Sequence, residues 1–338
     1  MADARRLGSL AQVPDLDRWV AFSRPGRVEV RTGKVELGQG ILTALAAIAA
    51  DELGVDPGRI DMVSGITGTT PNEWITAGSG SVEQSGMAVR QACAHARRLL
   101  VERAAVHLGA GVDGADGLVV DDGEVVAPGG ERVDYWTLTA GRPFEHRVEV
   151  ALDGVPAEAR RWTGRGLGRV DLAAKVRGEA VFVHDLVLPG MRHARVVRTA
   201  RPGARLLGAV PPTVGRADVV RNGSFLAVVA DREADAVAAA EELAALARWD
   251  GGDAVADDEA TPAVLEDQEG ERLAIVDGTA ADHPPGPSPA HGGSQRLRAT
   301  YSRPFLLHGS IGPSAAVASF ADGKLQVWSH SQGPELLR

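Results

Sequence analysis

The sequence is poor in cysteine, in aromatic residues and in long apolar runs. Cys93 is the only cysteine among 338 residues. One thiol excludes an internal disulfide, a four-cysteine zinc site and the four-thiolate cradle of an iron–sulfur cluster. No run approaches the roughly 18 apolar residues that a membrane span requires, and the first residues lack the apolar core of a secretory signal. We therefore expect a cytoplasmic protein without a membrane partner.

A strong excess of one charge is also lacking. The formal net charge is −9, from 45 acidic and 36 basic residues, so the chain has no general attraction to nucleic acid or anionic lipid. The nine histidines show no HxxxH or HxH spacing, and no metal site is expected from protein ligands. What the chain has in quantity is glycine (41) and proline (19), and its length suggests two or three domains.

A strand–helix–strand–helix unit is predicted near the N-terminus. Alternating apolar residues predict strands, and apolar residues at helical spacing predict helices. The predicted elements are a strand at 28–35, a helix at 41–53 that ends at Gly54, a strand at 60–64, a loop rich in Gly, Ser and Thr over 64–81, and a helix from Val82. Cys93 lies on the apolar stripe of the second helix, which favours a buried structural thiol over a nucleophile.

The rest of the chain alternates strand and helix signals. We expect short hairpins over 111–130, a basic glycine-rich passage between domains at 160–169, paired strands at 180–184 and 193–197, a buried strand at 225–230 and a helix at 233–247. An acidic, Pro/Gly-rich connector follows. A β-rich segment begins near residue 297.

The sequence Gly38-Gln39-Gly40 precedes the predicted helix at 41–53. Free backbone N–H groups and the positive end of the helix dipole make such a start an anion site, and the Gln39 amide can both donate and accept hydrogen bonds. The alternative is a tight turn in which the two glycines only supply unusual φ angles. A lone GxG pattern favours that alternative.

The run TAGSGS at 76–81 is a second glycine-bearing helix start. Its hydroxyls and glycine amides suit a phosphate or another oxyanion, whereas Ser79 or Ser81 could equally be an ordinary helix N-cap. Two such starts in one unit could converge on one large polyanionic ligand. By spacing alone, His308 and Ser331-Gln332 are no more than a core histidine and a turn.

Three stretches together resemble the molybdopterin-binding subunits of the xanthine dehydrogenase and aldehyde oxidase family. Residues 33–81 resemble its molybdopterin-binding signature, and residues 168–198 resemble its a/b hammerhead domain. YSRPFLLHGSIGPSAAVA and VWSHSQGP resemble the opening of its first large molybdopterin-binding domain. Here the GQG and TAGS segments precede the hammerhead, an order that resembles the large subunits of isoquinoline 1-oxidoreductase and nicotinate dehydrogenase-like proteins.

The resemblance implies a molybdenum–molybdopterin cofactor in its cytosine dinucleotide form. By position, the residues implied to contact it are Gly38, Gln39, Gly40, Thr76, Ala77, Gly78, Ser79, Ser81 and Gln332. Gln332, preceded by Ser331, matches the glutamine that in this family approaches an oxygen on molybdenum. No catalytic residue and no protein metal ligand is assigned.

The implied reaction is hydroxylation of an aldehyde or N-heteroaromatic substrate, with water as the oxygen source. Electrons would leave through a small partner subunit that carries [2Fe–2S] clusters. The family's glycine-rich segment after the [ST]-Q position and its general-base glutamate have no counterpart before Arg338, and Gly80 replaces a basic side chain. We therefore expect the chain to be the N-terminal part of such a large subunit and to be inactive without the C-terminal half. If the large subunit is split, that half is a separate partner.

The expected fold class is α+β. We expect an N-terminal molybdopterin-binding segment at 1–158, an a/b hammerhead domain at 164–250, the connector at 251–295 and the truncated start of a second molybdopterin-binding domain at 296–338. Two alternative functions remain: a truncated product without activity, and a non-catalytic module that binds a nucleotide or phosphate without molybdenum.

Overall fold

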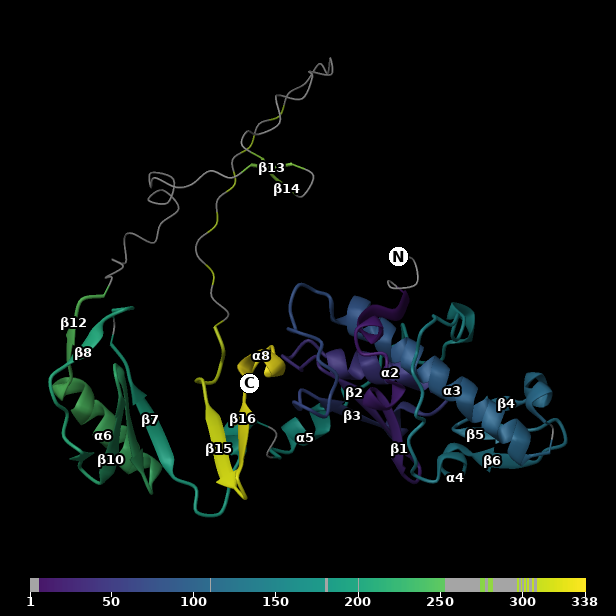
Figure 1. The fold of residues 1–338 in the computed structure, drawn as a ribbon, viewed down its shortest axis with the longest axis horizontal. Coiled ribbons are helices and arrows are strands. Elements are labelled where there is room, and N and C mark those ends of the chain that lie inside the picture. Colours follow the sequence, from purple (N-terminus) through teal and green to yellow (C-terminus); the bar gives the residue numbers. More distant parts are fainter. Residues whose placement is uncertain are drawn as a thin grey trace. The chain divides into compact units, whose positions relative to one another are not determined.

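The computed structural model describes residues 6–109, 111–179, 182–199, 201–252, 274–276, 279–281, 297, 299, 301, 303, 306 and 309–338. The chain divides into two compact units, which we describe separately (Figure 1). Unit 1 comprises residues 1–186 and 314–338, and unit 2 comprises residues 187–313. The mixture of helices and strands agrees with the expected α+β class.

A three-stranded sheet lies at the centre of unit 1. Strand β1 (Val20–Arg24) is antiparallel to β2 (Arg27–Thr32), and β3 (Ile60–Ser64) is parallel to β2. Helix α2 (Ile41–Leu53) connects the two parallel strands, and α3 (Met87–His107) packs against α2. The predicted strand at 28–35 ends early, at Thr32. At the next residue, Gly33, the backbone lies so close to Pro71 and Glu73 that a Cβ atom would collide with them.

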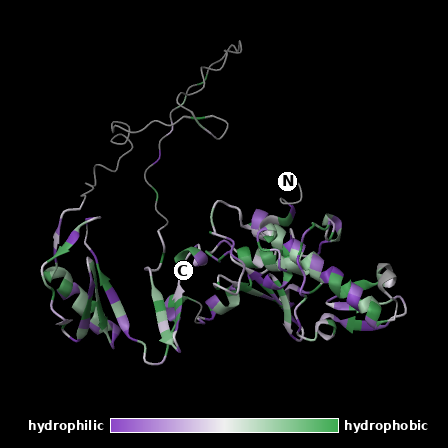
Figure 2. Cartoon of the chain, viewed as in Figure 1, coloured by the Kyte–Doolittle hydropathy of each residue, from purple (hydrophilic) through white to green (hydrophobic). Residues whose placement is uncertain are grey.

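Apolar side chains from α2, α3 and the sheet form the core of unit 1. Val30, Leu45, Leu53 and Leu100 are completely buried, and each contributes about 1.5–3 kcal/mol through its removal from water. Along α3, hydrophilic residues alternate with hydrophobic residues (Figure 2). Cys93 is also completely buried, and this burial raises the pKa of its thiol. The predicted structural thiol is thereby confirmed.

The remaining elements of unit 1 are short. They are β4 (Val119–Asp121), β5 (Glu124–Val126), β6 (Arg132–Asp134), α4 (Tyr135–Thr139), α5 (Leu172–Val176), β15 (Ala316–Ala321), β16 (Lys324–Ser329) and α8 (Pro334–Leu337). The antiparallel pairing of β4, β5 and β6 confirms the predicted hairpins. The buried Tyr135 hydroxyl donates to the carbonyl oxygen of Leu53 (2.8 Å) and so holds α4 against the end of α2.

Unit 2 contains a four-stranded antiparallel sheet in the order β7-β11-β10-β9. Its described elements are β7 (His193–Val197), β8 (Arg205–Leu207), β9 (Thr213–Val214), β10 (Ala217–Asn222), β11 (Phe225–Ala230), α6 (Glu233–Leu246), β12 (Arg248–Asp250), β13 (Ala274–Val276) and β14 (Thr279–Ala281). Helix α6 packs on this sheet and shares one core with it. The predictions at 193–197, 225–230 and 233–247 are confirmed.

The predicted strand at 180–184 and its pairing with β7 are wrong. Residues Val183–Asp185 form a 3-10 turn, and β7 pairs with β11 instead. The apolar run of β11 offers β7 a buried partner, which the exposed segment before Leu188 does not. Most of the predicted connector at 251–295, and His308, lie outside the described residues.

Among the residues that the structure describes, no helix combines the length and the hydropathy needed to cross a bilayer.

Candidate functional site

Three segments that are far apart in the sequence meet at Thr76. The Val35 N–H donates to Thr76 Oγ1 (2.9 Å), which joins the segment leading into GQG to the TAGSGS run. The Thr76 N–H donates to the Gln332 carbonyl oxygen (2.7 Å), and Gln332 Nε2 donates to the Thr76 carbonyl oxygen (3.0 Å). The structure therefore brings together all three predicted cofactor segments.

Gln332 keeps hydrogen-bonding capacity after it has paired with Thr76. Its amide nitrogen carries two hydrogens and uses one of them, and its Oε1 has no partner among the described residues. The next residues anchor the segment: the Gly333 N–H donates to Ser331 Oγ (3.1 Å), and Glu335 Oε1 accepts from the Gly68 N–H (3.4 Å). Gln332 is thus held at a defined place beside the loop over 65–80.

The N-terminus of α2 binds an anion that the chain itself provides. The Glu36 carboxylate accepts the N–H groups of Gly38 and Gly40 through Oε1 (2.8 Å each). Its Oε2 accepts the Leu42 N–H (3.3 Å). The prediction that these N–H groups are free is therefore wrong, because Glu36 is near enough in the chain to reach back onto the helix start. The positive φ angles of Gly38 and Gly40 agree with the alternative of a tight turn, and contact of this start with a cofactor stays a prediction.

Gln39 closes the GQG turn. Its Oε1 accepts the Leu37 N–H (2.6 Å), and its Nε2 donates to the Val35 carbonyl oxygen (3.1 Å). Gly38 (φ 106°) and Gly40 (φ 79°) have left-handed backbones, and a Cβ atom on either would meet no atom within 4 Å. The turn therefore depends on glycine for its backbone conformation, and its outer side is open.

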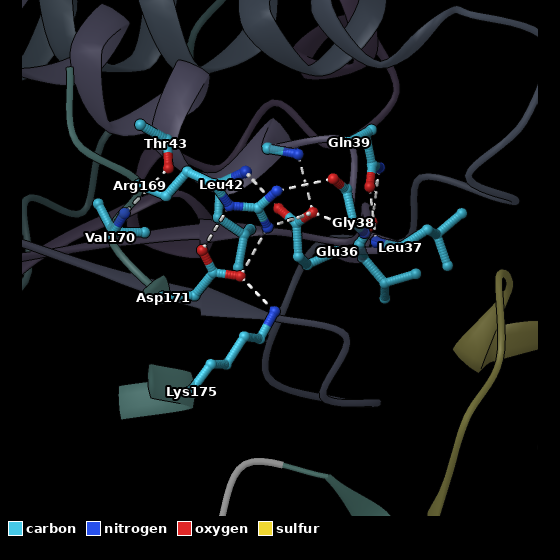
Figure 3. A network of polar contacts seen from close by, with 12 residues as sticks. Glu36, Leu37, Gly38, Gln39, Leu42, Thr43, Arg169, Val170, Asp171 and Lys175 are labelled. Carbon is cyan, nitrogen blue, oxygen red and sulfur yellow. Dashed lines mark hydrogen bonds and ion pairs between the residues drawn. The ribbon is translucent and has the colours of Figure 1, made fainter. Parts of the chain in front are cut away.

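A charged network holds the GQG turn from the side (Figure 3). Arg169 Nη1 donates to the Gly38 carbonyl oxygen (2.7 Å), and its Nη2 lies 3.4 Å from Glu36 Oε1. The Asp171 carboxylate accepts from Arg169 Nε (2.9 Å) and from Lys175 Nζ (2.5 Å). The hydrogen bond to Asp171 raises the pKa of Arg169, and the bonds from Arg169 and Lys175 lower the pKa of Asp171.

The network shows that the basic passage at 160–169 is more than a connection between domains. The Val170 N–H donates to Thr43 Oγ1 (3.1 Å) in the first turn of α2. This passage and the following α5 therefore lie against the start of α2. The arginines in the glycine-rich RRWTGRGLGR stretch were the available sequence signal for this role.

The exposed part of the TAGSGS run has an unusual backbone. Gly78 (φ 64°) and Ser79 (φ 57°) are both left-handed, and the following residues form a π-helical turn at Ser81–Gly86 before α3. The predicted helix from Val82 thus begins as a wider turn. This turn has no side-chain cap, and the hydroxyls of Ser79 and Ser81 have no hydrogen bond within the described ranges. The alternative of an ordinary serine N-cap is therefore wrong.

A buried lysine lies under the loop at 65–80. Lys34 is only 2% exposed, and its ammonium donates to the carbonyl oxygens of Glu73 and Ile75 (2.9 Å each). Gln84 Oε1 lies 3.4 Å from the same nitrogen. Burial lowers the pKa of Lys34, while the attraction of Glu73 acts against this shift. No sequence pattern predicted this residue, because its partners come from a loop distant in the chain.

The Glu73 side chain completes this buried polar cluster. Its Oε2 accepts from Thr32 Oγ1 (2.7 Å), from the Gly33 N–H (2.8 Å) and from Ser85 Oγ (3.0 Å). Glu73 is 4% exposed, and its Oε1 has no partner within the described part of the chain. Lys34 and Glu73 together fix the loop relative to β2 and to the π-helical turn.

No group of three or more His, Cys, Asp or Glu side chains in the described ranges is arranged to hold a metal ion. The site combines backbone N–H groups, hydroxyls and amides with the guanidinium of Arg169 and the carboxylates of Glu36 and Asp171. The hydrogen-bond donors among these groups are of the kind that bind phosphate and other oxyanions.

Comparison with known proteins is consistent with this donor set. Residues 8–167 match the family model of a molybdopterin cofactor-binding domain. The chain is 35% identical to a subunit of nicotinate dehydrogenase from Pseudomonas putida, over 96% of its own length and 28% of that protein. It is 34% identical to the gamma subunit of the 6-hydroxypseudooxynicotine dehydrogenase complex of Paenarthrobacter nicotinovorans, over 41% of this chain and 18% of that one.

A shorter match links the chain to the xanthine dehydrogenases. Xanthine dehydrogenase of Blastobotrys adeninivorans is 37% identical over 68 residues, which cover 20% of this chain and 5% of that protein. The chain thus spans less than a third of the length of each of these three relatives. The resemblance found in the sequence motifs is confirmed: residues 8–167 match a molybdopterin cofactor-binding domain, and the relatives that the chain resembles include a nicotinate dehydrogenase subunit and a xanthine dehydrogenase.

Proposed function

We propose that the chain holds the pterin cofactor in a molybdenum hydroxylase that oxidises an aldehyde or an N-heteroaromatic compound. The junction at Thr76 carries this proposal. Through Val35 and Gln332 it joins three segments that resemble three parts of one cofactor site. The similarity to a subunit of nicotinate dehydrogenase favours an N-heteroaromatic substrate.

The residues present fit a cofactor that carries phosphate. The carboxylate of Glu36 occupies the N–H groups of Gly38 and Gly40, so a phosphate would bind at this turn by displacing that carboxylate. Ser79 and Ser81 offer hydroxyls in a second exposed segment. Positive backbone dipoles and hydroxyls at two helix starts suit the phosphates of a dinucleotide, and we propose the cytosine dinucleotide form.

The described residues have distinct roles in this proposal. Segments 38–40 and 76–81 bind the cofactor, and Arg169 keeps the first of them in place through the Gly38 carbonyl oxygen. Gln332, fixed by Thr76, directs its remaining amide hydrogen to the ligand. When bound, the cofactor supplies the two-electron oxidation of a substrate carbon, with water as the oxygen source.

The wider arrangement is also a proposal. We propose an a/b hammerhead domain at 164–250 and the first strands of a second molybdopterin-binding domain at 296–338. We further propose as partners a small subunit with [2Fe–2S] clusters and, if the large subunit is split, a polypeptide that contributes the rest of it. The names of the two relatives that are subunits of dehydrogenases support a multi-subunit assembly.

Cofactor content is the direct test. The chain is purified from a host that makes the molybdenum cofactor, and the molybdenum and the cytidine monophosphate released per chain are measured. Gln39→Ala removes two hydrogen bonds that close the GQG turn, each worth about 0.5–1.5 kcal/mol, and is expected to lower occupancy roughly tenfold. Gln326→Ala, on the exposed face of β16, is the control. Equal molybdenum content in the two variants would contradict the assignment.

A further inference from the structure

We infer that Trp74 is a ligand-stacking residue of this site, and that its indole packs against a planar aromatic heterocycle. Two sources share this chemistry: a ring of the cofactor and the ring of an N-heteroaromatic substrate. The inference rests on the proposed function, because that function brings such a ring to the loop at 65–80.

The conformation of Trp74 is costly and brings it no burial. Its φ of 63° lies in the left-handed region, and the residue is 67% exposed. A left-handed φ is a rare outlier for a bulky residue, and such outliers persist only where the surrounding structure imposes them. Since this indole adds nothing to the core, the stability of the core does not explain the left-handed backbone of Trp74.

The buried cluster imposes the conformation from both sides. Lys34 Nζ binds the carbonyl oxygens of Glu73 and Ile75, the residues directly before and after Trp74. The Trp74 N–H donates to Asn72 Oδ1 (3.0 Å). The backbone is thus held on each side of Trp74, while the side chain remains in solvent. A buried ammonium and a buried carboxylate therefore serve to present one exposed aromatic ring.

The location of Trp74 indicates the kind of ligand. Thr76, at which the three cofactor segments meet, follows two positions later. The exposed neighbours of Trp74 in the chain, Asn72 and the segment 77–79, are small or polar, so the chain beside the indole offers hydrogen-bonding groups rather than further apolar side chains. A single flat ring among polar groups suits the face of a heterocycle, with which it stacks regardless of the exact ring substituents.

The experiment uses the full chain and three probes: pterin, cytidine 5′-monophosphate and nicotinate. Affinities are measured by titration calorimetry for the wild type, Trp74→Ala, Trp74→Phe and Phe320→Ala. Phe320 is the matched control, because it is an aromatic side chain in the same unit and is 73% exposed. We expect about tenfold weaker binding of at least one probe by Trp74→Ala, nearly full retention by Trp74→Phe and no change in Phe320→Ala.

The outcomes separate the two sources. A loss confined to pterin or cytidine monophosphate identifies a cofactor ring, and a loss confined to nicotinate identifies the substrate. Equal affinities of the wild type and Trp74→Ala for every probe, or no binding of any probe by the wild type, would overturn the inference. Molybdenum content, measured on the same preparations, reports separately on the proposed function. If the wild type contains no molybdenum but binds a probe more tightly than Trp74→Ala does, the proposed function is refuted and the stacking role is not.

Discussion

Replacing Lys34 by methionine tests whether the buried cluster organises the site loop. The change keeps most of the apolar volume and removes the ammonium. The carbonyl oxygens of Glu73 and Ile75, each 2.9 Å from Nζ, then lose a charged donor. Because Lys34 is 2% exposed, water cannot replace that donor without opening the loop.

The expected cost follows from these contacts. Each buried acceptor left without a donor costs about 1–3 kcal/mol, and the contact to Gln84, at 3.4 Å, adds little. The loss is partly offset because no ammonium has to be desolvated in the variant. Two such acceptors together cost about 2–6 kcal/mol, and after the offset we expect Lys34→Met to destabilise by about 2–4 kcal/mol.

Urea unfolding, monitored by tryptophan fluorescence and circular dichroism, measures the change. Lys175→Met is the matched control, because Lys175 is 30% exposed and pairs with Asp171 on the surface, where a pair contributes at most about 1 kcal/mol. If Lys34→Met costs no more than Lys175→Met, the buried ammonium does not hold the loop and the reasoning fails.

The pH dependence of stability gives a second check on Lys34. Burial lowers its pKa in the folded state below the ordinary 10.5, so between those two values the unfolded chain binds more protons than the folded chain. Stability therefore rises with pH across that window. The difference in unfolding free energy between the wild type and Lys34→Met should widen as the pH approaches 10.5. A gap that stays constant or narrows would show that this ammonium is not desolvated.

Two further predictions concern unit 1. Gly54 and Gly40 both have left-handed φ (67° and 79°), but a Cβ on Gly54 would lie 2.9 Å from Val120 Cγ1, whereas one on Gly40 meets no atom within 4 Å. In thermal unfolding, Gly40→Ala should cost about 1 kcal/mol and Gly54→Ala about 2–3 kcal/mol; equal costs would contradict the role of the contact. Burial of Asp51 acts to raise its pKa, but hydrogen bonds from residues 161–163 outweigh this and lower it. Its stabilising effect is therefore full above the ordinary value of 3.8 and is lost as the pH falls through the folded-state pKa. Asp51→Asn should destabilise by about 1–3 kcal/mol at pH 7, and a difference from the wild type that does not shrink on acidification would refute this.

Local features that the sequence encodes were predicted closely. The helix at 41–53, its end at Gly54 and the buried strand at 225–230 have the predicted bounds. Their signals are side-chain periodicity and a terminal glycine, which act between residues a few positions apart. The buried state of Cys93 followed from the same periodicity.

Contacts between distant segments were beyond the sequence. The motifs identified Thr76 and Gln332 separately, but their mutual hydrogen bonds depend on how the C-terminal segment packs in unit 1. The error at 180–184 has the same origin, because β7 found a better apolar partner in β11.

The sequence by itself determined the kind of site: two glycine-bearing helix starts and a glutamine segment with family resemblance. Only the tertiary structure decided how these groups are engaged. It placed the carboxylate of Glu36 on the start of α2, and it placed Lys34 and Glu73 beneath the loop that carries Trp74. The physical reason is that a hydrogen-bonding group takes whichever partner the fold brings within reach, and burial determines how strongly that partner is needed.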